Sequence, residues 1–199
     1  MTATRPGRLP AAERRAALVA SACRVFARGS YRGTTTSELA REAGVTEPIL
    51  YRHFSSKRDL YLACLDESWR ATRELWDAAV AGEPDPALWL TTMGRAFLES
   101  AARQTTGTLW VHALAEARED AEIARYMRTH IRDVQGHVAG VLRRAQELGG
   151  IPADRDPDAE AWIFLALGLL SMADRTLGGL MDDAWPAIRQ ARLRAVADR

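Results

Sequence analysis

The stretch GVTEPILYRHF, residues 44–54, gathers side chains that donate hydrogen bonds to anions. Tyr51 and His53 lie two residues apart, and Lys57, the only lysine of the chain, follows four residues after His53. A phenol, an imidazole and an ammonium group all suit phosphate oxygens, and such contacts position a protein on a nucleic acid without reading its sequence. The spacing therefore predicts a phosphate-binding surface. The alternative, in which these side chains only pack on the protein or are solvated, is accepted here for Phe54 alone.

Two short helices must hold these residues in place. Thr35 followed by Glu38 predicts a capping box that begins the first helix, which ends at Gly44. Thr46 is expected to cap the second, with Pro48 in the first turn, where N–H groups have no partner within the helix. Apolar side chains that can close a small core between the two helices are Leu39, Ala40, Val45 and Leu50. Such a pair is a helix-turn-helix, whose second helix offers its N-terminal residues to the major groove of DNA.

The distribution of charge supports a nucleic-acid partner for the N-terminal part only. Residues 1–60 hold eleven Lys and Arg against five Asp and Glu, a balance of +6, and this count includes Arg5 and Arg8. The remaining 139 residues hold 16 basic and 21 acidic residues, a balance of −5. The asymmetry predicts a basic module for a polyanion, residues 1–60, joined to a module of another purpose, residues 61–199.

The periodicity of the chain is helical throughout, so the expected fold class is all-α. A first helix is predicted from about Pro10 to Arg28, and a fourth, capped by Ser56 with Asp59, runs to about Val80. Four or five further helices follow, with breaks expected at residues 82–86, 105–107, 119–120, 149–158 and 178–185. We therefore expect an N-terminal three-helix module followed by a larger helical domain.

Residues 33–60, GTTTSELAREAGVTEPILYRHFSSKRDL, resemble the DNA-binding domain of the TetR (tetracycline-repressor-like) transcriptional regulators. The similarity covers roughly residues 14–65 and rests on the threonines before the second helix, AGV, LYRHF and Lys57. It implies phosphate contacts from Thr35, Thr36, Tyr51, His53 and Lys57, and base contacts from Thr46, Glu47, Pro48 and Ile49. Many members of the family carry glycine at the position of Pro48, although proline also occurs there.

Glu47 fits this surface least well, because a carboxylate near phosphates is repelled. It can accept a hydrogen bond from the N4 amine of cytosine. The interpretation we favour is that it is solvated and interacts with the dipole of its own helix.

The resemblance also implies a C-terminal domain that binds a small-molecule inducer and dimerises. All six tryptophans lie beyond the DNA-binding module. A helical domain rich in aromatic and methionine side chains can enclose an apolar or planar ligand, whereas the alternative for each residue is a place in the core. The expected ligand-binding residues are Trp69, Met93, Phe97, Trp110, Met127, His130, Trp162 and Leu165.

Residues 156–180 are apolar on nearly all sides of the expected helix. Such a helix must be covered all round. We expect its copy in a second subunit to provide the cover, with a last helix that contributes Ile188, Ala191 and Ala195. A symmetric homodimer would place two recognition helices against an inverted repeat.

Other classes of function find little support in the sequence. His130 and His137 lie seven residues apart, about 10 Å along a helix, which is too far to share one metal ion. No catalytic constellation or phosphate-binding glycine loop is found, and no cofactor is expected. No secretion signal is recognised, the longest apolar run is 13 residues, and Cys23 and Cys64 are expected to be free thiols, so we expect a cytoplasmic protein without a membrane span.

The sequence thus predicts a homodimeric repressor that binds a double-stranded DNA operator and is released from it by a small-molecule inducer. Two alternatives stay open. One is a helical small-molecule-binding protein with a vestigial helix-turn-helix, and the other is a constitutive repressor without a small-molecule inducer.

Overall fold

The computed structural model describes residues 10–101, 103–181, 183–188 and 190–191, and the regular elements of these residues are all helices. Arg5, Arg8 and Ala195, which enter the predictions above, lie outside the described residues. The elements are α1 (Ala11–Arg28), α2 (Thr36–Glu42), α3 (Glu47–His53), α4 (Lys57–Ala81), η1 (Pro86–Leu88), α5 (Trp89–Glu99), α6 (Arg103–Glu116), α7 (Ala121–Glu147) and α8 (Pro157–Thr176). The predicted all-α class is confirmed.

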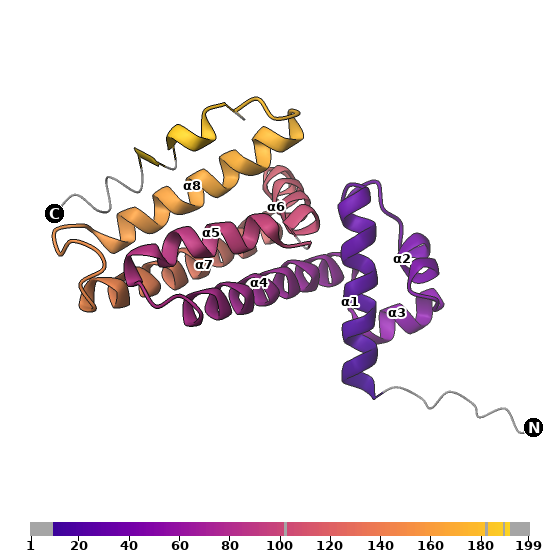
Figure 1. The fold of residues 1–199 in the computed structure, drawn as a ribbon. Helices are drawn as coiled ribbons and strands as arrows, with labels where there is room; N and C mark the ends of the chain where they lie inside the picture. The colour runs from indigo at the N-terminus through magenta and orange to yellow at the C-terminus, as the bar shows by residue number, and fades with distance from the viewer. Residues whose placement is uncertain (1–9, 102, 182, 189, 192–199) are drawn as a thin grey trace, which may run out of the picture.

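The helices form a small N-terminal module and a larger helical body (Figure 1). Helices α1, α2 and α3 pack together at one end, and α5 to α8 lie together at the other. Helix α4 runs from the first group into the second, and position 60, where we placed the domain boundary, lies inside it. A single continuous helix, rather than a linker, therefore joins the two parts.

The caps of α2 and α4 form as their sequences predict. Thr35 Oγ1 accepts a hydrogen bond from the backbone N–H of Glu38 (3.2 Å), and the Glu38 carboxylate accepts one from the N–H of Thr35 (2.9 Å). At α4, Ser56 Oγ accepts from the N–H of Asp59 (3.0 Å). The expected cap at Thr46 is absent, because this residue makes no side-chain capping bond although it occupies the N-cap position of α3.

The turn between α2 and α3 depends on Gly44. Its φ of +65° lies in the left-handed region, which glycine adopts without steric penalty. The turn is closed by the N–H of Val45, which donates to the carbonyl of Ala40 (2.9 Å). Leu39 and Leu50, one from each short helix, are buried in the same core as Phe26 of α1. This packing holds α3 in the N-terminal module.

One predicted helix break is wrong. Residues 105–107 lie within α6, and the break instead precedes Arg103 and follows Glu99. Gly107 serves packing here, since a Cβ atom on it would lie only 3.3 Å from Cγ of Met172 on α8. Glycine in the middle of a helix thus marks a close approach of two helices and not a turn.

Both cysteines are free and buried, as expected. Over the described residues, no helix combines the length and the apolarity that a bilayer span requires.

Candidate nucleic-acid interface and effector domain

Helix α3 turns one face to the core and leaves the other open. Leu50 is buried and anchors the helix, whereas Thr46 and Pro48 are exposed and Ile49 is half-buried. Tyr51 keeps 49% of its surface exposed, so its hydroxyl is free to reach a phosphate oxygen. The residues expected to contact bases thus begin α3, and Tyr51 stands one residue after its buried anchor.

The first residues of α2 and α3 are joined by a hydrogen bond that neither interpretation of Glu47 includes. The hydroxyl of Thr36 donates to Oε2 of Glu47 over 2.8 Å, and both residues are half-buried. The carboxylate is therefore held against the start of α2 instead of being free in solvent. Because Thr35 is engaged in its capping box, both threonines already order the start of α2, close to where phosphate contacts are expected.

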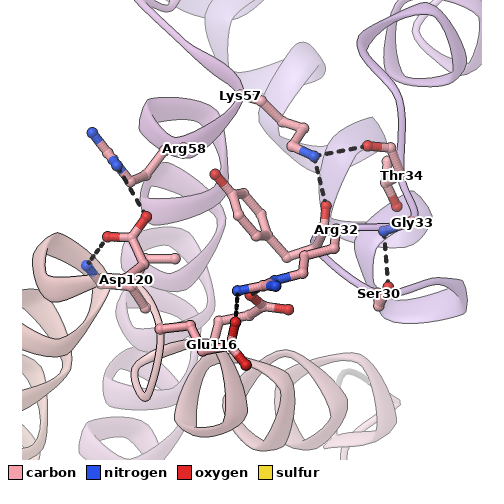
Figure 2. A network of polar contacts seen from close by, with 11 residues as sticks. Ser30, Arg32, Gly33, Thr34, Lys57, Arg58, Glu116 and Asp120 are labelled. Carbon is pink, nitrogen blue, oxygen red and sulfur yellow. Dashed lines mark hydrogen bonds and ion pairs between the residues drawn. The ribbon is translucent and has the colours of Figure 1, made fainter.

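Lys57 is oriented by the loop between α1 and α2. Its Nζ donates to the carbonyl oxygens of Tyr31 (2.8 Å) and Thr34 (3.0 Å), and it lies 4.5 Å from the centroid of the Tyr31 ring. Figure 2 shows the ammonium group reaching across to this loop. An ammonium group has three donors, so one N–H remains for a phosphate oxygen. Lys57 thus holds the segment that leads into α2, a role that the sequence pattern alone does not reveal.

Two arginines, Arg32 in this loop and Arg58 on α4, connect the N-terminal module to the larger body (Figure 2). Arg32 Nε donates to Glu116 at the end of α6 (2.9 Å), and a second nitrogen of Arg32 pairs with Glu119. Arg58 Nη1 donates to Asp120 (2.9 Å), and Arg58 also pairs with Glu122. All four acids lie at the junction of α6 and α7. We refer to these six residues as the junction network.

The junction network was missed at the level of sequence, since its partners are 62 and 84 residues apart along the chain. Exposed ion pairs contribute about 0–1 kcal/mol each. The network therefore matters less for the stability of the fold than for the position of the N-terminal module against the body. A buried contact lies beside it, where the hydroxyl of Tyr61 donates to the carbonyl of Leu109 on α6 (3.1 Å). The start of α4 is therefore attached to α6 by both charged and neutral bonds.

Three of the residues expected to bind a ligand meet in the body of the protein. Trp110 Nε1 donates to Nε2 of His130 over 2.9 Å, and the Trp69 ring stands edge-on to the His130 ring at 6.2 Å. Tyr126 stacks on His130 at 5.5 Å and donates its hydroxyl to Asp66 on α4 (2.6 Å). The donated bond requires an unprotonated Nε2, so His130 is a neutral residue that receives a hydrogen bond.

The other predicted ligand residues divide into two groups. Met93, Met127 and Leu165 are buried, and Phe97 is half-buried 6.4 Å from Trp76. Trp162 lies apart from them, with 47% of its surface exposed on α8. The structure therefore brings most of these residues into the hydrophobic core of the body but leaves Trp162 on an outer face.

Burial lowers the pKa of two histidines in this region. For His130, the cost of charging a buried ring outweighs the attraction of Asp66 and Asp133, so its pKa lies below the usual value. The pKa of His137 is lowered for the same reason, with Asp77 opposing the shift. His137 Nε2 lies 3.3 Å from Asp77 Oδ1 without an aligned hydrogen bond, and its ring stacks on Trp76.

Comparison with known proteins assigns both parts of the chain. Residues 18–64 match the bacterial regulatory proteins of the tetR family, and residues 86–197 match the C-terminal domain of BetI-type transcriptional repressors. Over 61 residues the chain is 49% identical to the transcriptional activator FasR of Mycolicibacterium smegmatis. This match covers 31% of this chain and 28% of FasR. The chain is 28% identical over 163 residues to the regulator TtgR of Pseudomonas putida, spanning 78% of this chain and 77% of TtgR.

Solved structures share the fold. A TetR-family regulator from Rhodococcus sp. superimposes with a TM-score of 0.81 at 19% identity, covering 93% of this chain and 98% of that one. A regulator from Saccharomonospora viridis in complex with choline gives a TM-score of 0.72 at 20% identity, covering 85% and 88%. The C-terminal family match covers more than half of the chain, and the N-terminal match is to the same kind of regulator. The protein therefore belongs to the TetR family of transcriptional regulators and is not an enzyme.

Proposed function

We propose that the protein is a homodimeric repressor that binds an inverted-repeat operator through α3 and leaves it when a small molecule binds the C-terminal body. The observation that carries this proposal is the junction network, which links the segment between α1 and α2 to the end of α6 and the start of α4 to the start of α7. A change in the body that moves the end of α6 would act on Arg32 and hence on the start of α2. DNA affinity and ligand affinity would then be coupled reciprocally.

The outer face of α8 supports a dimer. Trp162, Leu170 and Leu177 follow one another at intervals of eight and seven residues, so they lie on one side of the helix. Their side chains are exposed, as are Ala166 and Ala173 between them. An exposed apolar stripe of this length is typical of a protein–protein interface. On this proposal Trp162 belongs to the dimer contact rather than to the ligand site.

Relatives differ in the direction of regulation. The BepR protein of Brucella suis, 27% identical over 162 residues, is a transcriptional repressor, whereas FasR is an activator. A solved structure of AibR, with a TM-score of 0.60, holds both isovaleryl coenzyme A and operator DNA. The match to the C-terminal domain of BetI-type transcriptional repressors favours repression.

The proposal is tested with double-stranded DNA from the region upstream of the protein's own coding sequence. Fluorescence anisotropy should give tight binding that weakens steeply with salt, and native mass spectrometry should show an even number of chains per DNA. A shuffled DNA of the same composition is the control. Equal affinity for both DNAs would reject operator binding.

Base reading by α3 is tested separately. Ile49→Ala or Thr46→Ala should change which operator variants are preferred, by about 1–3 kcal/mol for each base pair read. A selection of bound sequences from a random library measures this change for each variant beside the unaltered protein. A uniform loss of affinity with unchanged preference would assign these residues a structural role.

A further inference from the structure

The body contains a half-open cleft between α6 and α8, away from the aromatic residues predicted to bind a ligand. Its volume is about 410 Å³, within the range of about 300–1,000 Å³ usual for small-molecule sites. Residues of α6 form one wall and residues of α8 form the other. Gly107 allows this arrangement, because its missing side chain lets Met172 approach α6 closely.

The cleft is cationic. Arg175 lines it with an exposed guanidinium group that makes no ion pair with any described residue. His112 also lines it, and its buried Nδ1 has no hydrogen-bond partner within the described part of the chain. Nδ1 has almost no surface open to solvent, so Arg175 is the group that can pair with an anion in the cleft. The described residues that line the cleft include no Asp or Glu.

The other residues that line the cleft indicate the chemical character of the rest of the ligand. Val111 and Met172 contribute apolar surface, and Gln104 contributes an amide. The hydroxyl of Thr108 donates to the carbonyl of Gln104 within α6 (2.9 Å), so it offers only lone pairs to the cleft. A site with one guanidinium, one imidazole and apolar walls fits a small molecule with one carboxylate and a hydrocarbon or aromatic body.

We propose that this cleft binds a small amphipathic monocarboxylate, with Arg175 paired to the carboxylate and the side chains of Val111, His112 and Met172 around its body. The role of this cleft as the effector site rests on the proposed function. His112 lies four residues before Glu116, about 6 Å along the axis of α6, and Glu116 holds Arg32 of the junction network. A ligand bound between α6 and α8 therefore acts directly on the helix that touches the N-terminal module.

The binding test uses the full chain without DNA, with 4-fluorobenzoate as probe and 4-fluorobenzamide as its neutral counterpart, both observed by fluorine NMR. The benzoate should bind at least tenfold more tightly than the benzamide. Arg175→Gln should weaken the benzoate at least tenfold and leave the benzamide unchanged. Arg132→Gln, which removes an exposed arginine of α7, is the matched control and should have no effect. Equal binding of both probes, or a benzoate affinity that Arg175→Gln does not change, would overturn the proposal.

The position of the probe is tested by labelling the methyl groups of the five methionines with carbon-13. Met172 lines the cleft, whereas Met93 and Met127 are buried among the residues first predicted to bind the ligand. Addition of 4-fluorobenzoate should shift the Met172 methyl signal and leave those of Met93 and Met127 in place. Shifts at Met93 and Met127 alone would overturn the proposal. Neither result depends on DNA, so failure of operator binding and failure of this site are separate outcomes.

Discussion

At the scale of single residues, polar side chains near α3 hold backbone and neighbours in place before any DNA arrives. Lys57 is bonded to two carbonyls, Thr35 closes a capping box, and Thr36 is bonded to Glu47. Such pre-organisation reduces the conformational entropy lost on binding. If these residues contact DNA as proposed, a substitution here has two effects, one on that contact and one on the geometry of the module.

Lys57→Ala separates these two effects. Loss of the bonds to Tyr31 and Thr34 should lower the free energy of unfolding by about 1–3 kcal/mol. If the third N–H of Lys57 contacts phosphate, the variant should also bind all DNA sequences less tightly, with a salt slope smaller by about one unit. Urea unfolding and anisotropy at several salt concentrations measure the two quantities. A weaker affinity with an unchanged slope would mean that Lys57 acts only through the loop.

The two buried histidines predict how stability depends on pH. Because burial lowers the pKa of His130 and of His137, the unfolded chain binds more protons than the folded one near pH 6. The free energy of unfolding should therefore fall as the pH decreases from 7.5 to 5.5. His130→Gln should reduce this dependence, and the double variant with His137→Gln should reduce it further. Urea unfolding at both pH values provides the measurement. If the free energy of unfolding of the double variant depended on pH as strongly as that of the unaltered protein, the prediction would be contradicted.

At the scale of elements, the structure connects neighbours that the sequence could not pair. The capping box of α2, the Ser56 cap of α4 and the turn at Gly44 involve residues close along the chain, so their patterns were sufficient to predict them. The bond between Thr36 and Glu47 and the junction network depend on how helices pack, which sequence periodicity does not determine. The wrong prediction of a break at residues 105–107 has the same origin. The role of Gly107 is set by Met172, which is far away along the chain but packs against it.

Substitution of Arg32 tests the junction network. Arg32→Gln should lower the free energy of unfolding by less than about 1 kcal/mol, because its ion pairs are exposed. Hydrogen exchange in residues 29–35 should nevertheless become faster, since the loop loses its attachment to α6. Arg70→Gln is the matched control, because Arg70 also pairs with two glutamates but only within α4. Equal exchange in both variants would show that the network does not order the loop.

At the scale of the whole molecule, the class of fold and the DNA-binding module were predictable, but the use of the C-terminal body was not. The helix-turn-helix has a fixed spacing of polar and apolar residues, whereas a ligand site needs only a cavity. Aromatic residues such as Trp69 and Trp110 suggested a ligand site, and the structure packs both against His130, another residue of that predicted site. The cleft between α6 and α8 is formed by residues of ordinary types, which no sequence pattern distinguishes.

The apolar stripe on α8 gives a prediction for the assembly. Leu170→Glu combined with Leu177→Glu would place two charges in the proposed contact, where a buried unpaired charge is strongly unfavourable. Sedimentation should then give a mass near the 22.0 kDa of one chain, in place of twice that value. Operator affinity should fall at least hundredfold, because one subunit reads only half of the repeat. Exposed Leu148, at the end of α7, provides the control substitution Leu148→Glu, which should leave the mass unchanged.

The continuity of α4 has a mechanical consequence. Its 25 residues contain neither proline nor glycine, so the helix, about 37 Å long, has no point at which it bends easily. A tilt of about 5° at one end displaces the other by about 3 Å, as a stiff lever does. That displacement is close to the rise of one base pair, about 3.4 Å. The affinity for an operator whose half-sites are moved apart by a single base pair should therefore indicate which tilt of α4 the protein adopts.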